Sequence, residues 1–198
     1  MGLAHGGADL EKFELVHVRQ ILSVVLQITI GLTVAEAALN FEHRDTHLSN
    51  VLVMATDAEE IRFKCENIRY AVATHGVHAT LIDCTLSRID TGQGEVYKNL
   101  SDDPALFTGS VKDPQSEVYR AMKRATNDDW KTFCPKTNVI WVEYVVSSLV
   151  KMYKKKLASA TELADVAAKT KILQMKKALS KAQSLRELAP DFFEESRI

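Results

Sequence analysis

Residues 21–35 form an uncharged, mostly apolar stretch bounded by Arg19 and Glu36, and this stretch constrains the fold more than any other feature of the 198-residue sequence. A membrane span needs roughly 20 mostly apolar residues. This stretch is shorter, and it also contains serine, glutamine and threonine side chains. We therefore predict a buried core element of a folded domain and no membrane partner.

The type of this core element is ambiguous, because apolar and polar residues alternate through much of the stretch with the period of a strand. Against a strand, residues 9–40 contain no proline and one glycine, and residues 35–39 are typical of a helix. An uninterrupted strand of this length would also be exceptional. We predict a long buried helix.

The rest of the chain predicts one mainly α domain with a small β insert. Apolar runs predict strands at residues 50–54 and 79–82, with further short strands or a surface excursion at 61–73. Glycine and proline at 91–114 predict a long loop. Helical patterns follow at residues 117–124, 139–155 and 162–179, the last with Ser159 and Glu162 as a possible capping box.

The charge of the chain is unevenly distributed. Residues 1–150 carry a net charge of -6 and residues 151–198 one of +5, which gives -1 in total. A globally basic nucleic-acid binder is therefore excluded, and lysines such as Lys151 and Lys154 are better explained by the end of a helix than by a nucleic-acid site. Three cysteines without a C-x-x-C spacing favour a reducing compartment such as the cytoplasm.

The string from His43 to Asn50 has the spacing H-R-D-x-x-x-x-N and lies directly before a predicted strand. Phosphoryl transfer needs an acceptor hydroxyl placed in line and cations that neutralise the phosphate. Asp45 is predicted to orient that hydroxyl and accept its proton. Asn50 and Asp83, the latter at the end of the second strand, are predicted to bind Mg²⁺ through oxygen atoms. His43 and Arg44 are predicted to orient the loop, and Arg44 to brace the segment after Asp83.

Five segments together resemble the C-terminal lobe of haspins, which are atypical eukaryotic serine/threonine protein kinases. The resemblance covers about residues 6–188. It includes D-C-T at residues 83–85, where haspins have D-Y-T, and His47, which replaces the usual catalytic-loop lysine. The segments are FEHRDTHLSNVLV (41–53), LIDCTLSRID (81–90), LFTG (106–109), VYRAMKR (118–124) and NVIWVEY (138–144).

The resemblance implies a single kinase C-terminal-lobe domain over residues 1–198, within which four segments resemble known parts of the family. Residues 1–12 resemble a segment after the hinge, 43–50 the catalytic loop, 83–119 the metal-binding and activation segment, and 120–198 a helical remainder. Catalytic roles are implied for Asp45 and His47. Nucleotide contacts are implied for Gly6, Gly7, Asp9, Leu52 and Ile82, and substrate contacts for Glu11 and Asp113.

The resemblance also implies ATP and Mg²⁺ as cofactors, and a basic histone tail as the protein substrate, phosphorylated on threonine during mitosis in the nucleus on chromatin. The acidic substrate patch is weaker than in haspins, since residues 110–113 keep one carboxylate and include Lys112.

No Gly-rich loop or V-A-I-K lysine can be placed in the sequence, so we expect the chain to lack the small lobe of a kinase. A pseudokinase or a protein-binding module therefore stays an alternative. A second, less favoured alternative is a small-molecule phosphotransferase with an H-x-D-x-x-x-x-N loop.

Overall fold

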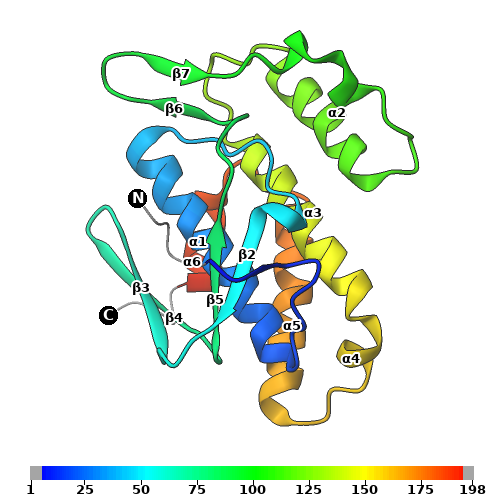
Figure 1. The fold of residues 1–198 in the computed structure, drawn as a ribbon. Coiled ribbons are helices and arrows are strands. Elements are labelled where there is room, and N and C mark those ends of the chain that lie inside the picture. The colour runs from blue at the N-terminus through cyan, green and yellow to red at the C-terminus, as the bar shows by residue number, and fades with distance from the viewer. Residues whose placement is uncertain (1–5, 194–198) are drawn as a thin grey trace.

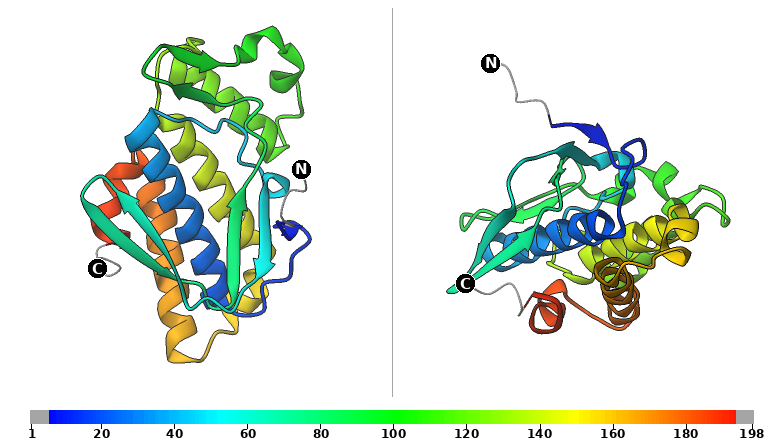
Figure 2. Two further views of the ribbon diagram at one scale, coloured as in Figure 1. Left: turned by 60° about the vertical axis from the view of Figure 1, so that its left-hand side comes forward. Right: turned by 90° about the horizontal axis from the view of Figure 1, so that it is seen from below.

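Helix α1 (Val18–Leu39) runs through the middle of the computed structural model, which describes residues 6–193 (Figure 1). It contacts α3 and α5 on one side and strands β3 and β5 on another, so both views of Figure 2 show it enclosed by other elements. Most of its residues from Ile21 to Thr33 are buried. The prediction of a long buried helix is confirmed.

The polar residues of α1 explain why its sequence imitates a strand. Thr29 and Thr33 donate their hydroxyls to the carbonyl groups four residues earlier, at 2.7 and 2.8 Å, which satisfies them inside a helix. Gln27 donates to the carbonyl of Val77 at 3.0 Å and accepts from the amide of Ala79 at 2.8 Å. The alternating polar residues are thus hydrogen-bonded inside a helix that is mostly buried. Although α1 is long and apolar enough to cross a membrane, 67% of its most apolar window is buried inside the protein.

Within residues 6–193, three small antiparallel sheets accompany the helices. Strand β2 (Val51–Ala55) lies between β1 (Ala8–Asp9) and β5 (Val77–Leu81), with Val51 opposite Leu81. The hairpin of β3 (Glu60–Cys65) and β4 (Ile68–Ala73) covers α1, and β6 (Arg88–Asp90) pairs with β7 (Glu95–Tyr97) beside α2 (Figure 1). The predicted strands are present, and the mainly helical class is confirmed at this coarse level, although the strands form three sheets rather than one insert.

The remaining helices follow the predicted order with two differences. They are α2 (Pro114–Thr126), α3 (Lys136–Met152), α4 (Lys154–Ala158), α5 (Leu163–Leu179) and α6 (Ala189–Phe193). The predicted helix over 139–155 is interrupted at Tyr153, whose hydroxyl accepts from the amide of Leu15 at 3.0 Å and donates to the carbonyl of Phe13. The predicted capping box is wrong, because Glu162 is itself the N-cap residue and its carboxylate pairs with Arg19 at 3.2 Å.

Residues 91–114 are less irregular than predicted. They contain β7 and two 3₁₀ turns, Leu100–Asp102 and Pro104–Phe107. These turns and α2 enclose a second hydrophobic core, separate from the main one around α1. Its buried members are Leu100, Val118, Tyr119, Met122, Trp130 and Trp141. The segment after Asp83 is therefore held by its own core.

Candidate active site

The segment after α1 brings Asp45 and Asn50 into contact. A 3₁₀ turn, Leu48–Asn50, reverses the chain so that the side-chain amide of Asn50 points back at Asp45. Its Nδ2 atom donates to the backbone oxygen of Asp45 at 2.9 Å and to Oδ2 at 3.2 Å. Both residues are at most 9% exposed. Burial raises the pKa of the Asp45 carboxyl above its ordinary value, and the hydrogen bond from Tyr119 opposes this increase.

Asp83 lies immediately after the backbone contact that joins the two strand ends. The amide of Ile82 donates to the carbonyl of Asn50 at 3.0 Å. Asp83 has a φ of 62°, in the left-handed region, and its side chain is exposed. Its Oδ1 accepts from the amide of Thr85 at 3.2 Å and from the Thr85 hydroxyl, and these bonds hold the pKa of Asp83 below its usual range. Asp83 is therefore ionised at neutral pH.

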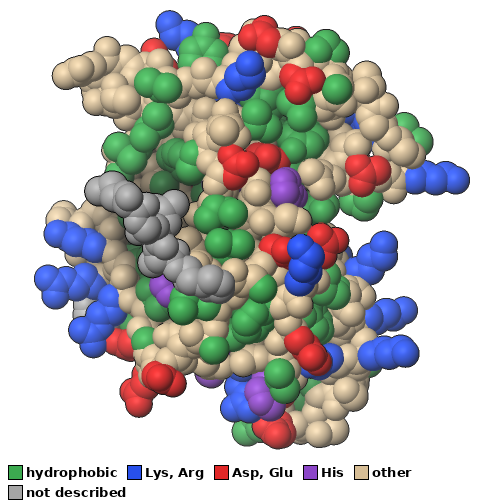
Figure 3. Space-filling view, in the orientation of Figure 1, with side chains coloured by type: hydrophobic (Ala, Val, Ile, Leu, Met, Phe, Trp, Pro, Cys, Tyr) green, Lys and Arg blue, Asp and Glu red, His purple; other side chains and the backbone are tan. Residues whose placement is uncertain are grey.

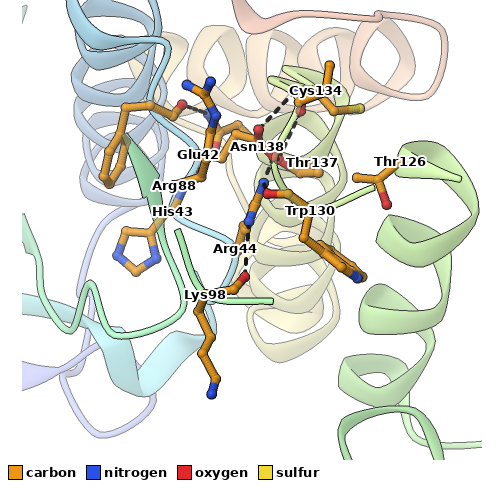
Figure 4. Close-up of polar contacts among 12 residues, drawn as sticks. Glu42, His43, Arg44, Arg88, Lys98, Thr126, Trp130, Cys134, Thr137 and Asn138 are labelled. Carbon is orange, nitrogen blue, oxygen red and sulfur yellow. Dashed lines mark hydrogen bonds and ion pairs between the residues drawn. The ribbon is translucent and has the colours of Figure 1, made fainter. Parts of the chain in front are cut away.

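A buried ion pair supports the candidate loop from behind. Arg44 and Glu42 are both fully buried, with Nε and Oε2 3.1 Å apart. Arg44 also donates to the carbonyl of Trp130 at 2.8 Å and to that of Lys98 at 3.4 Å, as Figure 4 shows. Glu42 accepts from Thr137 at 2.8 Å. Arg44 thus contacts Lys98, which lies in the segment that follows Asp83.

A second buried chain of hydrogen bonds runs through Asn138 on α3. Its Oδ1 accepts from the amide of His43 at 3.0 Å, and its Nδ2 donates to Glu36 at 2.9 Å (Figure 4 shows the first contact). The ring of His43 in turn bonds the carbonyl of Ile82 at 3.1 Å. Burial lowers the pKa of His43, so the ring is neutral and can hold this carbonyl by its N–H. His43 therefore connects α3 to the strand end beside Asp83.

Aromatic side chains surround Asp45 on the other side. The hydroxyl of Tyr119, from α2, donates to Oδ1 of Asp45. Tyr119 meets Trp141 edge to face, with ring centroids 5.3 Å apart, and the His47 ring lies 6.5 Å from Trp141. His47 is also 3.8 Å from Oδ2 of Asp45. Sequence reasoning missed Tyr119 as a site residue, because nothing in its spacing relates it to Asp45 74 positions earlier.

The predicted nucleotide residues lie on β1 and β2, directly before β1, or at the end of β5. A Cβ on Gly7, whose φ is 98°, would lie 2.1 Å from the Val53 carbonyl oxygen, and one on Gly6 would lie 2.6 Å from the Leu52 side chain. Glycine is therefore required at residue 7, where the chain passes close to the Val53 carbonyl, whereas the end of the Leu52 side chain can move away from a Cβ on Gly6. Ile82 lies at the end of β5 beside Asn50. Asp9 lies opposite Leu52 where β1 pairs with β2, and its carboxylate is directed to Lys12, at 2.7 Å.

The two predicted substrate residues lie in different settings. Glu11 accepts from the Ser49 hydroxyl at 3.3 Å and so reaches the candidate loop. Asp113 is the N-cap of α2, where it accepts from the amides of Gln115 and Ser116 at 3.3 and 2.9 Å. Its carboxylate is engaged in capping, and no contact joins it to Asp45 or Glu11 within residues 6–193. Figure 3 shows acidic side chains beside a histidine on the drawn face, between the region of α2 at the top and the rest of the domain below it.

The donor atoms at the strand ends fit a magnesium ion. Mg²⁺ prefers oxygen ligands and is usually bound through one or two carboxylates together with phosphates and water. Asp83 provides an ionised carboxylate with Oδ2 unengaged by residues 6–193, and Asn50 keeps Oδ1 unengaged in the same range because Nδ2 makes its bonds to Asp45. In the described part of the chain no three His, Cys, Asp or Glu side chains cluster around one point, so a cage made wholly of protein is not formed there.

Comparison with known proteins gives consistent matches. A family model described as "Haspin like kinase domain" matches residues 1–191. A serine/threonine-protein kinase haspin homolog of Arabidopsis thaliana is 39% identical over 191 residues, 96% of this chain and 31% of that protein. The haspin of Mus musculus is 39% identical over 151 residues, 75% of this chain and 20% of that protein. A haspin homolog of Schizosaccharomyces pombe is 37% identical, with 79% and 35% covered. The chain thus spans about a third or less of these relatives.

Proposed function

Because the chain belongs to the haspin-like kinase family, we propose that it forms the C-terminal lobe of a serine/threonine protein kinase site. The observation that carries the proposal is the contact of Asn50 with Asp45, joined to the Asp83 strand end by the Ile82 to Asn50 hydrogen bond. A general base and oxygen ligands for a cation are among the parts that phosphoryl transfer to a hydroxyl uses.

In this proposal, each side chain has a defined role. Asp45 accepts a hydrogen bond from the acceptor serine or threonine hydroxyl and takes its proton as the oxygen attacks. Asn50 holds Asp45 through Nδ2 and presents Oδ1 to a cation, and Asp83 presents its carboxylate to the same region. Arg44 and His43 keep the loop and the Asp83 strand end in register from behind.

Mg²⁺ and ATP, when bound, supply the transferred γ-phosphoryl group and the positive charge that neutralises it. Leu52, Gly6 and Gly7 would form one apolar side of the nucleotide site, since they meet at the β1–β2 edge. His47, 3.8 Å from Asp45, would lie near the transferred phosphate.

For the acceptor we propose a basic protein segment, a threonine in a histone tail, and a role on chromatin in the mitotic nucleus. The family resemblance supports this assignment. A second support is electrostatic, because residues 1–150 carry a net charge of -6 and attract a cationic peptide. Glu11, bonded to Ser49 of the candidate loop, is the carboxylate best placed to meet such a peptide.

The proposal is tested with Asp45→Asn and Asp83→Asn in the complete protein that carries this chain, with Asp57→Asn as the control for an exposed aspartate in the hairpin region. Two measurements are made: the rise in melting temperature with Mg-ATP, and transfer of labelled phosphate to core histones. We expect Asp83→Asn to abolish the rise, since binding to the folded state alone stabilises it. Asp45→Asn should keep the rise and lower transfer about 10²- to 10⁴-fold.

Three outcomes would contradict the proposal. A wild-type protein that shows neither the Mg-ATP effect nor transfer is a pseudokinase or a binding module. Transfer to small alcohols in preference to histones indicates a small-molecule phosphotransferase. Equal losses in Asp57→Asn and Asp83→Asn would mean that the effect of Asp83 is not specific to its position.

A further inference from the structure

The hydroxyl of Tyr119 is the only group outside the candidate loop, within residues 6–193, that hydrogen-bonds the Asp45 carboxylate. Tyr119 is 6% exposed, and it comes from α2, 74 residues along the chain. A buried phenol needs a partner for its O–H. Here the partner is a carboxylate, and hydrogen bonds to charged groups are about twice as strong as neutral ones.

The two oxygens of Asp45 have different surroundings. Oδ1 receives the Tyr119 hydroxyl, whereas Oδ2 receives a longer bond from Asn50, at 3.2 Å, and lies 3.8 Å from His47. A carboxylate held at one oxygen by a phenol and at the other by an amide cannot rotate about its Cβ–Cγ bond without losing both. The side chain is therefore fixed in one orientation.

The position of Tyr119 is fixed by the packing of its ring and by the contacts at the start of its helix. Its ring meets the fully buried Trp141 edge to face at 5.3 Å, in the second hydrophobic core. The helix that carries Tyr119 begins at the Asp113 cap, and Arg120, the next residue, donates to the carbonyl of Gly109 at 2.9 Å. The position of the phenol is thus set by the segment that follows Asp83.

We propose that Tyr119 is a positioning residue, which fixes Oδ1 of Asp45 so that Oδ2 is presented to the acceptor hydroxyl. This inference rests on the proposed kinase function. It gives α2 a role beyond forming part of the second core. When α2 and the segment before it are folded, the Asp45 carboxylate is aligned. When they are displaced, Asp45 loses the bond from Tyr119, which is one of its two restraints.

The test is Tyr119→Phe in the complete protein, which removes the hydroxyl and keeps the ring. We expect kcat to fall about 10- to 100-fold, because small misplacements of a reacting group have effects of this size. The KM values for ATP and for a histone peptide should change less than about twofold, since a positioning role acts after both have bound. Replacement of Tyr119 by 4-aminophenylalanine, whose N–H can donate, should restore most of the loss.

Tyr144→Phe is the matched control. Tyr144 also meets Trp141 edge to face, at 5.4 Å, and makes no hydrogen bond to Asp45 within residues 6–193. Its loss of a hydroxyl should leave kcat unchanged. A crystal structure of Tyr119→Phe gives a readout without activity, in which the Asp45 carboxylate is expected to rotate away from its present orientation.

Each other result has a definite meaning. If the wild-type protein transfers phosphate and Tyr119→Phe does so equally well, or if both tyrosine variants lose kcat alike, the inference is wrong and the proposed function stands. An unchanged Asp45 orientation in the Tyr119→Phe crystal also overturns it. If the wild-type protein transfers no phosphate, the proposed function fails first and the positioning role fails with it.

Discussion

Two arginine–glutamate pairs in this protein have the same sequence spacing and nearly the same geometry, yet opposite surroundings. Arg44 and Glu42, behind the candidate loop, are both fully buried with Nε and Oε2 3.1 Å apart. Arg62 and Glu60, on the β3–β4 hairpin, are 2.7 Å apart but 75% and 38% exposed. The shorter distance belongs to the pair that water surrounds.

The comparison teaches that burial, rather than distance, decides what such a pair contributes. An exposed ion pair contributes little to the stability of the folded state, because water and salt screen its charges and two long side chains lose conformational freedom. A buried pair has lost its hydration, so the removal of one partner leaves an uncompensated charge. The loop that carries Asp45 is therefore attached to a buried ion pair whose disruption is costly, while Asp83 is exposed.

The largest effect is expected for Arg44→Leu, which breaks the buried pair. Glu42 keeps its bond from Thr137 but loses its cation, and the carbonyls of Trp130 and Lys98 lose their donor. The free energy of unfolding should fall by about 3 to 5 kcal/mol. Urea denaturation measures the change, and Arg44→Lys, which keeps the charge, should lose less. A loss equal to that of a surface substitution would contradict the contrast between the two pairs.

Glu36 sharpens the comparison, because it is a buried carboxylate that makes no ion pair within residues 6–193. It is 2% exposed and bonded to Asn138 and Ser184, with Arg186 too far for an ion pair and Glu42 as a neighbouring like charge. Burial raises its pKa from 4.5 to about 7. A raised pKa means that the folded state holds the proton more tightly than the unfolded one, so stability falls as pH rises from about 4.5 to about 7 and then levels off.

The pH dependence due to Glu36 amounts to about 3 kcal/mol over this window. Glu36→Gln should remove it, so that the variant is more stable than the wild type at pH 8 and similar to it at pH 4.5. Urea midpoints at several pH values measure the difference. Glu59→Gln, at an exposed site, is the control and should keep the wild-type slope. An unchanged slope in Glu36→Gln would mean that the pKa of Glu36 is the same in the folded and unfolded states.

Arg19 provides the intermediate case. It joins the start of α1 to α5 through Asp165, at 3.0 Å, and the two side chains are 33% and 14% exposed. Arg19→Gln should lower the free energy of unfolding by about 1 kcal/mol at low salt, and by less at high salt. A loss as large as that of Arg44→Leu would show that exposure does not rank these pairs.

The smallest effect is expected for Arg62→Ala on the hairpin. Its pair with Glu60 should contribute nothing measurable to the urea midpoint, either at low or at high salt. A clear loss of stability that salt does not change would indicate that the hairpin pair acts through packing.

The sequence predicted most of the secondary structure near the candidate site. Local sequence pattern predicts the helix α1, the strands β2 and β5, and the pairing of Asp45 with Asn50 five residues later. The structure contains these elements and this contact. The errors fall where distant residues intervene. The helix predicted from residue 139 stops at Tyr153, whose hydroxyl forms hydrogen bonds with the backbone of residues 13 and 15. The predicted capping box of Ser159 and Glu162 does not form, and the Glu162 carboxylate pairs with Arg19.

The sequence by itself therefore determined the contacts between residues close in the chain. These are the buried helix, the strands that follow the H-R-D-x-x-x-x-N string, and the contact of Asp45 with Asn50. Only the tertiary structure decided that Tyr119 reaches Asp45 and that Asn138 holds His43 across 95 residues. The physical reason is that backbone geometry fixes contacts a few residues apart, whereas contacts between distant residues depend on how two hydrophobic cores pack.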